Sequence, residues 1–126
     1  MKTSKRLNDA EIKKIAEEIA DAIRYNDEWD HGMYMERWLF VDLDDKTAYV
    51  EFSAGYCNAS SYFMGEYIAV SNVFVDKGTI YADDDAAECP LHEDDMAKIE
   101  EIARRELDGA VVYEFESPYD REAYAF

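Results

Sequence analysis

The chain has 126 residues, of which 48% are apolar and 14% aromatic; this is enough to bury a core and too apolar for a disordered chain. It carries 13 basic and 30 acidic side chains, a formal net charge of −17, which excludes a conventional nucleic-acid binder and disfavours an anionic membrane surface. Residues 1–24 hold six bases and five acids, whereas residues 25–126 hold seven and twenty-five. We expect a single domain over residues 1–126 whose acidity reflects a basic partner, adaptation to high salt, or solubility alone.

The first predicted element is a helix over residues 10–24. Asn8 can cap it, and Glu11 follows three residues later, as in a capping box. Isoleucine and alanine recur at spacings of three and four along the segment, which produces one apolar stripe opposite a charged face. We expect this stripe to face the core, and residues 1–7 to form a flexible N-terminus.

Alternating apolar and polar residues predict the next elements as strands. The predicted strands cover residues 33–43, 47–53, 66–76 and 79–82. A small-residue loop over residues 54–63 separates the second from the third, and a tight turn at Asp76–Gly78 joins the third to the fourth. One face of the first strand is unusually aromatic, with Tyr34, Trp38 and Phe40, so we expect it to be partly covered.

The last third of the chain predicts a second helix between two less regular segments. Residues 83–90 read as an acidic connector whose final proline stops any strand. The helix covers residues 93–107, with His92 as its N-cap, acids in its first turn and arginines in its last. A short strand falls within residues 111–116, and residues 117–126 form a C-terminal tail. This order predicts an α+β domain: N-terminal helix, four-stranded mostly antiparallel sheet, second helix and short C-terminal strand, with the helices on one sheet face.

The residues that could support catalysis form no recognised motif. Cys57 and several serines could pair with His31 or His92, but none lies in a family-specific setting. His92 is better explained as a helix cap and His31 as a turn residue. The five glycines form no phosphate-binding loop. We therefore expect neither an enzyme nor a bound cofactor.

A zinc site is the strongest metal candidate. Cys89 and His92 have a Cys-x-x-His spacing, and Cys57 and His31 could complete four ligands. Structural zinc sites usually bring their ligands as two close pairs, and only one such pair exists here. We favour two unrelated reduced thiols and no metal. The sequence shows no apolar signal region and no apolar run of membrane length. Together with the reduced thiols, these features predict a cytoplasmic protein.

Acidic residues are densest between Asp83 and Asp95, with seven acids and no base. The last three lie in a helix first turn, where the helix dipole stabilises them. The other four have no such structural explanation and are the predicted partner-binding residues: Asp83, Asp84, Asp85 and Glu88.

In size, charge and α+β class the chain resembles the small acidic inhibitors that mimic nucleic acid, which include anti-restriction and anti-CRISPR proteins and some toxin immunity proteins. The likeness lies in general character and transfers no residues. The leading hypothesis is a non-enzymatic binding module, an inhibitor or adaptor, that docks on a basic protein surface such as that of a nucleic-acid-binding protein. It would contact neither nucleic acid nor membrane directly. The alternative is a small enzyme or ligand-binding domain with an aromatic-lined pocket on the sheet.

Overall fold

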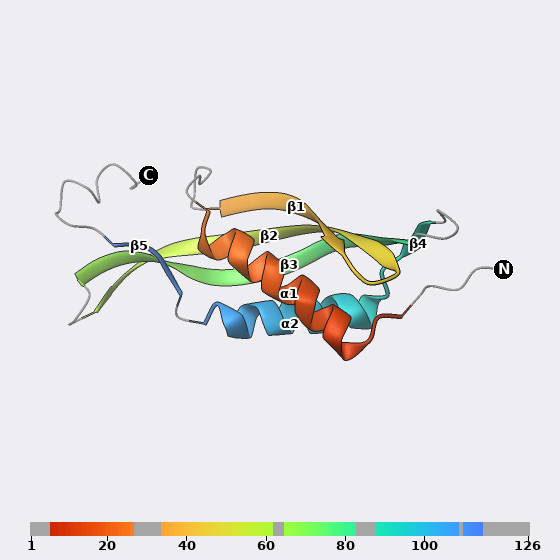
Figure 1. The fold of residues 1–126 in the computed structure, drawn as a ribbon. Helices are drawn as coiled ribbons and strands as arrows, with labels where there is room; N and C mark the ends of the chain where they lie inside the picture. The colour runs from red at the N-terminus through yellow and green to blue at the C-terminus, as the bar shows by residue number, and fades with distance from the viewer. Residues whose placement is uncertain (1–5, 27–33, 62–64, 83–87, 109, 115–126) are drawn as a thin grey trace.

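A computed structural model describes residues 6–26, 34–61, 65–82, 88–108 and 110–114. The elements in chain order are α1 (Asp9–Arg24), β1 (Tyr34–Asp42), β2 (Lys46–Ser61), β3 (Gly65–Ala82), β4 (Glu88–Pro90), α2 (Glu93–Glu106) and β5 (Val111–Glu114) (Figure 1). The predicted α+β class, with its N-terminal helix, antiparallel sheet and second helix, is confirmed. Neither described helix combines the length and apolar composition needed to cross a bilayer.

The sheet is antiparallel with the order β1-β2-β3-β4, and β5 pairs with the opposite end of β3 from β4. Both helices lie on the same side of it and against each other; in Figure 1, α1 crosses in front of the strands and α2 lies below them. We call this side of the sheet the helical face and the other side the open face. In β1, Met35 and Val41 are buried on the helical face, whereas Trp38 and Phe40 are exposed on the open face.

Both helices begin as the sequence predicts. The Asn8 side chain accepts the Glu11 backbone N–H at 2.8 Å, and the Glu11 carboxylate accepts the Asn8 N–H at 3.0 Å, which completes the capping box. His92 caps α2 by accepting the backbone N–H of Asp94 at its Nδ1 atom. The predicted stripes form the core with the inner strand residues; its largest fully buried members are Phe52, Ile12, Ile15, Ile19, Ile23, Met35, Ile68, Ile80, Ile99, Leu107, Val41 and Val50.

Two strand boundaries differ from the prediction because β2 and β3 form one long ribbon. Residues 54–61, expected as a loop, continue β2 and pair with β3. The expected turn at Asp76–Gly78 instead lies in the interior of β3, where Asp76 is the extra residue of a β-bulge. Gly78 is required by packing rather than by a turn, since a Cβ atom there would lie 2.5 Å from Cδ2 of Leu91.

The fourth strand of the sheet also comes from a different segment. The predicted third and fourth strands are both part of β3, and β4 lies at the end of the segment expected to be a connector. Glu88–Pro90 pairs with Thr79–Tyr81. Proline is tolerated there because β4 is an edge strand. The predicted short strand near the C-terminus is β5, and the predicted tail at residues 117–126 lies outside the described residues.

Part of the N-terminal segment expected to be flexible is held against α2. Arg6 donates to both carboxylate oxygens of Asp95, at 2.8 and 3.1 Å, and the Leu7 backbone N–H donates to the same group at 3.1 Å. Asp95 is fully buried and Leu7 is 7% exposed. The prediction of flexibility is therefore wrong for residues 6 and 7, and residues 1–5 lie outside the described chain.

Side chains of α2 close the stretch of β3 between its two short partner strands. The Glu100 carboxylate accepts the Val75 backbone N–H at 3.0 Å, and Arg104 Nε donates to the Val73 carbonyl at 3.0 Å. The two side chains also bond to each other at 2.6 Å. An unpaired strand edge readily pairs with another chain. Because the Glu100 and Arg104 side chains bond to this part of the β3 edge, the open face is the surface to consider for binding.

Candidate functional site

The predicted partner-binding segment is only partly visible. Asp83, Asp84 and Asp85 lie outside the described residues, so the structure does not place them. Glu88 is exposed at the start of β4 and pairs with Tyr81 of β3. This pairing places Glu88 at the end of the sheet, on the same side as the open-face residues of the neighbouring strands.

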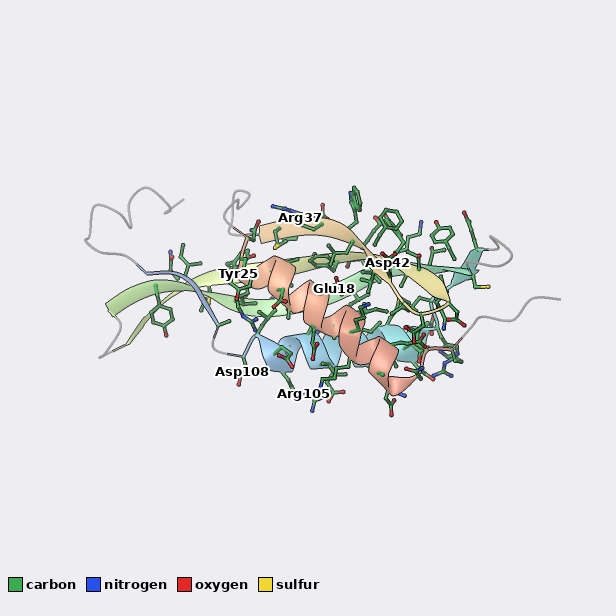
Figure 2. The ribbon with its side chains drawn as sticks, viewed as in Figure 1. Glu18, Tyr25, Arg37, Asp42, Arg105 and Asp108 are labelled. Carbon is green, nitrogen blue, oxygen red and sulfur yellow. The ribbon has the colours of Figure 1, made fainter. Side chains whose placement is uncertain are left out.

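The open face is defined by strand positions that alternate with the buried core residues. Figure 2 shows side chains projecting from this side of the sheet, away from α1 and α2. Its described residues include Tyr34, Glu36, Trp38, Phe40, Asp42, Thr47, Tyr49, Glu51, Asn72, Phe74, Lys77, Thr79, Tyr81 and Glu88.

Three aromatic rings gather at the centre of this face. The Trp38 and Phe40 rings meet edge to face with centroids 5.6 Å apart, and Tyr49 lies 5.1 Å from Phe40 and 6.3 Å from Trp38. Trp38 is 59% exposed and Phe40 57%. The prediction that this aromatic face is partly covered is therefore wrong for these two rings. Exposed aromatic residues held in one cluster are typical anchors of protein interfaces.

Carboxylates flank the aromatic cluster, and the Lys14 ammonium of α1 bonds to the backbone carbonyl of one of these residues, Asp42. Glu36, Asp42 and Glu51 form no ion pair with another residue in the described part of the chain. Desolvation, together with the charge of the neighbouring Glu51 carboxylate, raises the pKa of the Tyr49 hydroxyl. Lys77 is the one basic residue among the strand positions named for the open face, and the Arg104 guanidinium of α2 lies 5.5 Å from the centroid of the Phe74 ring at the edge of this face. The face therefore combines apolar rings with uncompensated negative charge.

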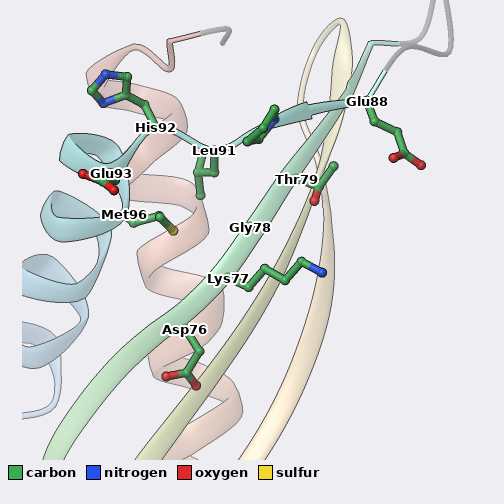
Figure 3. Close-up of a pocket in the computed structure, with 10 residues that line it drawn as sticks. Asp76, Lys77, Gly78, Thr79, Glu88, Leu91, His92, Glu93 and Met96 are labelled. Atoms are coloured by element: carbon green, nitrogen blue, oxygen red, sulfur yellow. The ribbon is translucent and has the colours of Figure 1, made fainter.

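A cavity of about 680 Å³ lies beside this face, between β3, β4 and the start of α2 (Figure 3). Lys77 and Glu88 point away from the helices, whereas His92 and Met96 lie on the helix side. The side chains thus do not converge on one centre, and His92 already uses its Nδ1 atom to cap α2. Among the described residues, no phenylalanine, tyrosine or tryptophan lines this cavity, so its described lining is not the aromatic-lined pocket that the alternative hypothesis requires.

The two cysteines cannot share a metal ion. Cys57 pairs with Ala69 near one end of β3 and Cys89 with Ile80 near the other, roughly 35 Å apart along an extended strand. Both thiols are free, Cys57 exposed and Cys89 buried. His31 lies outside the described residues. Within the described ranges, no three metal-ligating side chains are grouped together.

The sequence shows the aromatic row of β1 as alternation, and the alternative hypothesis places an aromatic-lined pocket on this face, whereas the predicted partner-binding residues lie in the acidic segment that leads into β4. Every second residue of β1 from Tyr34 to Asp42 belongs to the open face. Alternation separates two faces of a strand, but only the position of the helices decides which face remains open. Comparisons with protein-family models, curated proteins and solved structures give no match for this chain. The case for function therefore rests on the geometry of this face.

Proposed function

We propose that the protein is a non-enzymatic binding module, an inhibitor or adaptor, whose open face docks on a basic protein surface. One observation carries the proposal: Trp38 and Phe40 are more than half exposed beside carboxylates that have no ion-pair partner among the described residues. Buried aromatic anchors supply most of the binding energy of an interface, and complementary charge selects the partner and speeds association. The predicted residue Glu88 belongs to the same face.

The distribution of charge favours a basic partner over a second copy of this chain. Apart from Lys77, the described bases lie on or before the helices, or contact residues of α1 and its C-terminal end, as Lys46 and Arg37 do. Two open faces brought together would oppose carboxylates with carboxylates, which costs several kcal/mol of specificity. The carboxylates of the open face would instead neutralise a basic partner surface, such as one that binds nucleic acid.

The first test compares variants in an affinity purification from the native host. Wild type should retain a basic protein whose association rate falls steeply with salt. The double variant Trp38→Ala/Phe40→Ala should bind that protein at least about 10-fold more weakly, because it removes two anchors. Tyr25→Ala is the matched control, since Tyr25 is 76% exposed but lies at the end of α1 rather than on the open face.

A second variant separates the open face from the acidic segment that precedes β4. It replaces the four predicted residues by neutral amides: Asp83→Asn, Asp84→Asn, Asp85→Asn and Glu88→Gln. If this variant loses the partner while the aromatic double variant keeps it, the segment is the site and the open face is not. If wild type retains no basic protein even at low salt, the binding proposal fails and the small-enzyme alternative becomes the hypothesis to test.

A further inference from the structure

A hollow of about 310 Å³ lies on the open face where β1, β2 and β3 are neighbours. Pockets for drug-sized ligands have volumes of about 300–1,000 Å³, so this one is at the small end of the range and suits a single long side chain. The lining residues are Glu36, Arg37, Trp38, Glu51, Phe52 and Asp76.

The hollow coincides with an irregularity in strand pairing. Glu51 pairs with Lys77, but the next residue of β2, Phe52, pairs with Val75, which leaves Asp76 as the extra residue of a bulge. Bulges change the direction of a side chain and bend the strand. Asp76 therefore joins Glu51 among the residues that line the hollow, and it also lines the larger cavity between β3, β4 and α2.

Lys77 lies directly across from Glu51 in the strand pairing, but no described cation forms an ion pair with the carboxylates of the hollow. Glu36, Glu51 and Asp76 form no ion pair with another described residue. Arg37 contributes to the lining, but its guanidinium donates to the side-chain oxygen of Asn26, beyond the end of α1, at 2.6 Å. Carboxylates that share a site repel one another, so an incoming cation is favoured there.

The indole of Trp38 completes the site with an aromatic wall. Its contacts with Phe40 and Tyr49 restrain the ring, while 59% of the residue stays exposed to a partner. A cation over the face of tryptophan is attracted by the ring quadrupole. A guanidinium can stack on the ring and donate two parallel hydrogen bonds to a carboxylate, whereas an ammonium acts as a point charge.

From this geometry we infer that the hollow is an anchor site for an arginine side chain of the partner. The inference rests on the proposed function and specifies the chemistry that the open face recognises. It predicts that arginine is preferred over lysine at equal charge, which attraction to the net charge of −17 alone would not produce.

The probe is a blocked triarginine peptide, with blocked trilysine as its equal-charge comparison. Binding is followed by NMR at the indole N–H of Trp38, which is assigned from its absence in Trp38→Leu. Triarginine should shift this signal saturably and bind at least about 3-fold more tightly than trilysine.

Two site variants and one control locate the binding. In the variants, binding is followed by the backbone amide signals of the residues around the hollow, because Trp38→Leu lacks the indole signal. Affinity for triarginine should fall about 5-fold or more in Trp38→Leu and in Glu51→Gln/Asp76→Asn, because each removes one part of the recognition. The control Glu17→Gln/Glu18→Gln removes the same charge from the exposed side of α1 and should change affinity by less than about 2-fold. Backbone amide spectra of each variant establish that the fold is retained.

The possible outcomes separate this inference from the proposed function. Equal affinity for the two peptides, or equal losses in the site and control variants, would mean non-specific attraction and would overturn the arginine site. If the basic host protein still depends on Trp38 and Phe40 while triarginine leaves the indole signal unmoved, the arginine site fails and the proposed function stands. If neither the protein nor the peptide binds, both fail.

Discussion

The helical face and the open face of the sheet use charge in opposite ways. On the helical side, two carboxylates form ion pairs with bases from distant segments: Asp95 with Arg6 at 2.8 Å and Glu11 with Lys46 at 2.6 Å. These pairs tie separate segments to the helices. On the open face, carboxylates lie beside exposed aromatic rings, and in the described chain Lys77 is the one base among them. Negative charge is thus least compensated on the face that also exposes apolar anchors.

This difference indicates which charges support the fold and which are free to act on a partner. A carboxylate with several hydrogen-bond partners inside the protein costs stability when it is removed. An exposed carboxylate without an ion pair contributes little to stability, but it still generates a field that attracts a basic partner. Substitutions on the two faces should therefore separate stability from binding.

The largest difference should come from placing a charge on each face. Ile99→Asp and Ile15→Asp should each destabilise the domain by about 4 kcal/mol or more, or unfold it, because both residues are fully buried and no partner awaits the new carboxylate. Phe40→Asp on the open face should leave the fold intact. Urea denaturation measures all three, and a wild-type midpoint for either isoleucine variant would show that its helix is not packed as described.

Asp95→Asn tests the paired carboxylates of the helical side. It should cost about 1–3 kcal/mol, because the buried group loses its charge-assisted bonds to Arg6 and to the Leu7 N–H. Glu17→Gln, on the exposed side of α1, is the control and should change stability by less than about 0.5 kcal/mol. Equal urea midpoints for the two variants would mean that the hydrogen bonds to Asp95 do not hold residues 6 and 7 against α2.

The same residue predicts a pH dependence. The hydrogen bonds from Arg6 hold the pKa of Asp95 below its usual range, and the Leu7 N–H acts in the same direction against the effect of burial. A lowered folded-state pKa means that this stabilisation is complete above the unfolded value of about 3.9 and is lost as the pH falls through the folded value. The stability difference between wild type and Asp95→Asn should therefore shrink below about pH 4. A difference that stays constant on acidification would contradict the assignment.

Gly78→Ala tests how closely the chain packs against the helical face of β3. The added Cβ would lie 2.5 Å from Cδ2 and 2.9 Å from Cβ of Leu91, so we expect a loss of about 1–3 kcal/mol in thermal or urea unfolding. At Gly55 the nearest contact is the end of the Asn72 side chain, at 2.7 Å. That side chain can rotate away, so Gly55→Ala should cost less. The reverse order would mean that Leu91 adapts more easily than Asn72.

The smallest effect on stability should come from the aromatic cluster. Trp38→Ala should change the free energy of unfolding by less than about 1 kcal/mol, because an exposed ring on a sheet surface gains only its cross-strand contacts. The same change should weaken partner binding strongly. A loss of stability as large as that of Ile99→Asp would show that the ring serves the core, and the comparison between the two faces would fail.

Local patterns in the sequence were sufficient for the helices and for the first hairpin. The cap of α1 depends on Asn8 and Glu11, three residues apart, and the apolar stripes repeat within one or two helical turns. The pairing of β1 with β2 follows from alternation on both sides of a short turn. Interactions between residues that are close in the chain can be predicted directly from the sequence pattern. The same alternation found the aromatic row of β1 that became the centre of the candidate site.

Tertiary structure decided the features that depend on distant contacts. Gly78 reads locally as a turn residue, but Leu91 packs over it and keeps it inside a continuous strand. Asp95 reads as a helix first-turn acid, but Arg6, 89 residues away in the chain, makes it a buried partner. The aromatic row could equally have faced the helices, because alternation is symmetric between the two sides of a strand. The row stays exposed because α1 and α2 both bury their stripes against the opposite face, a choice made by packing over the whole domain.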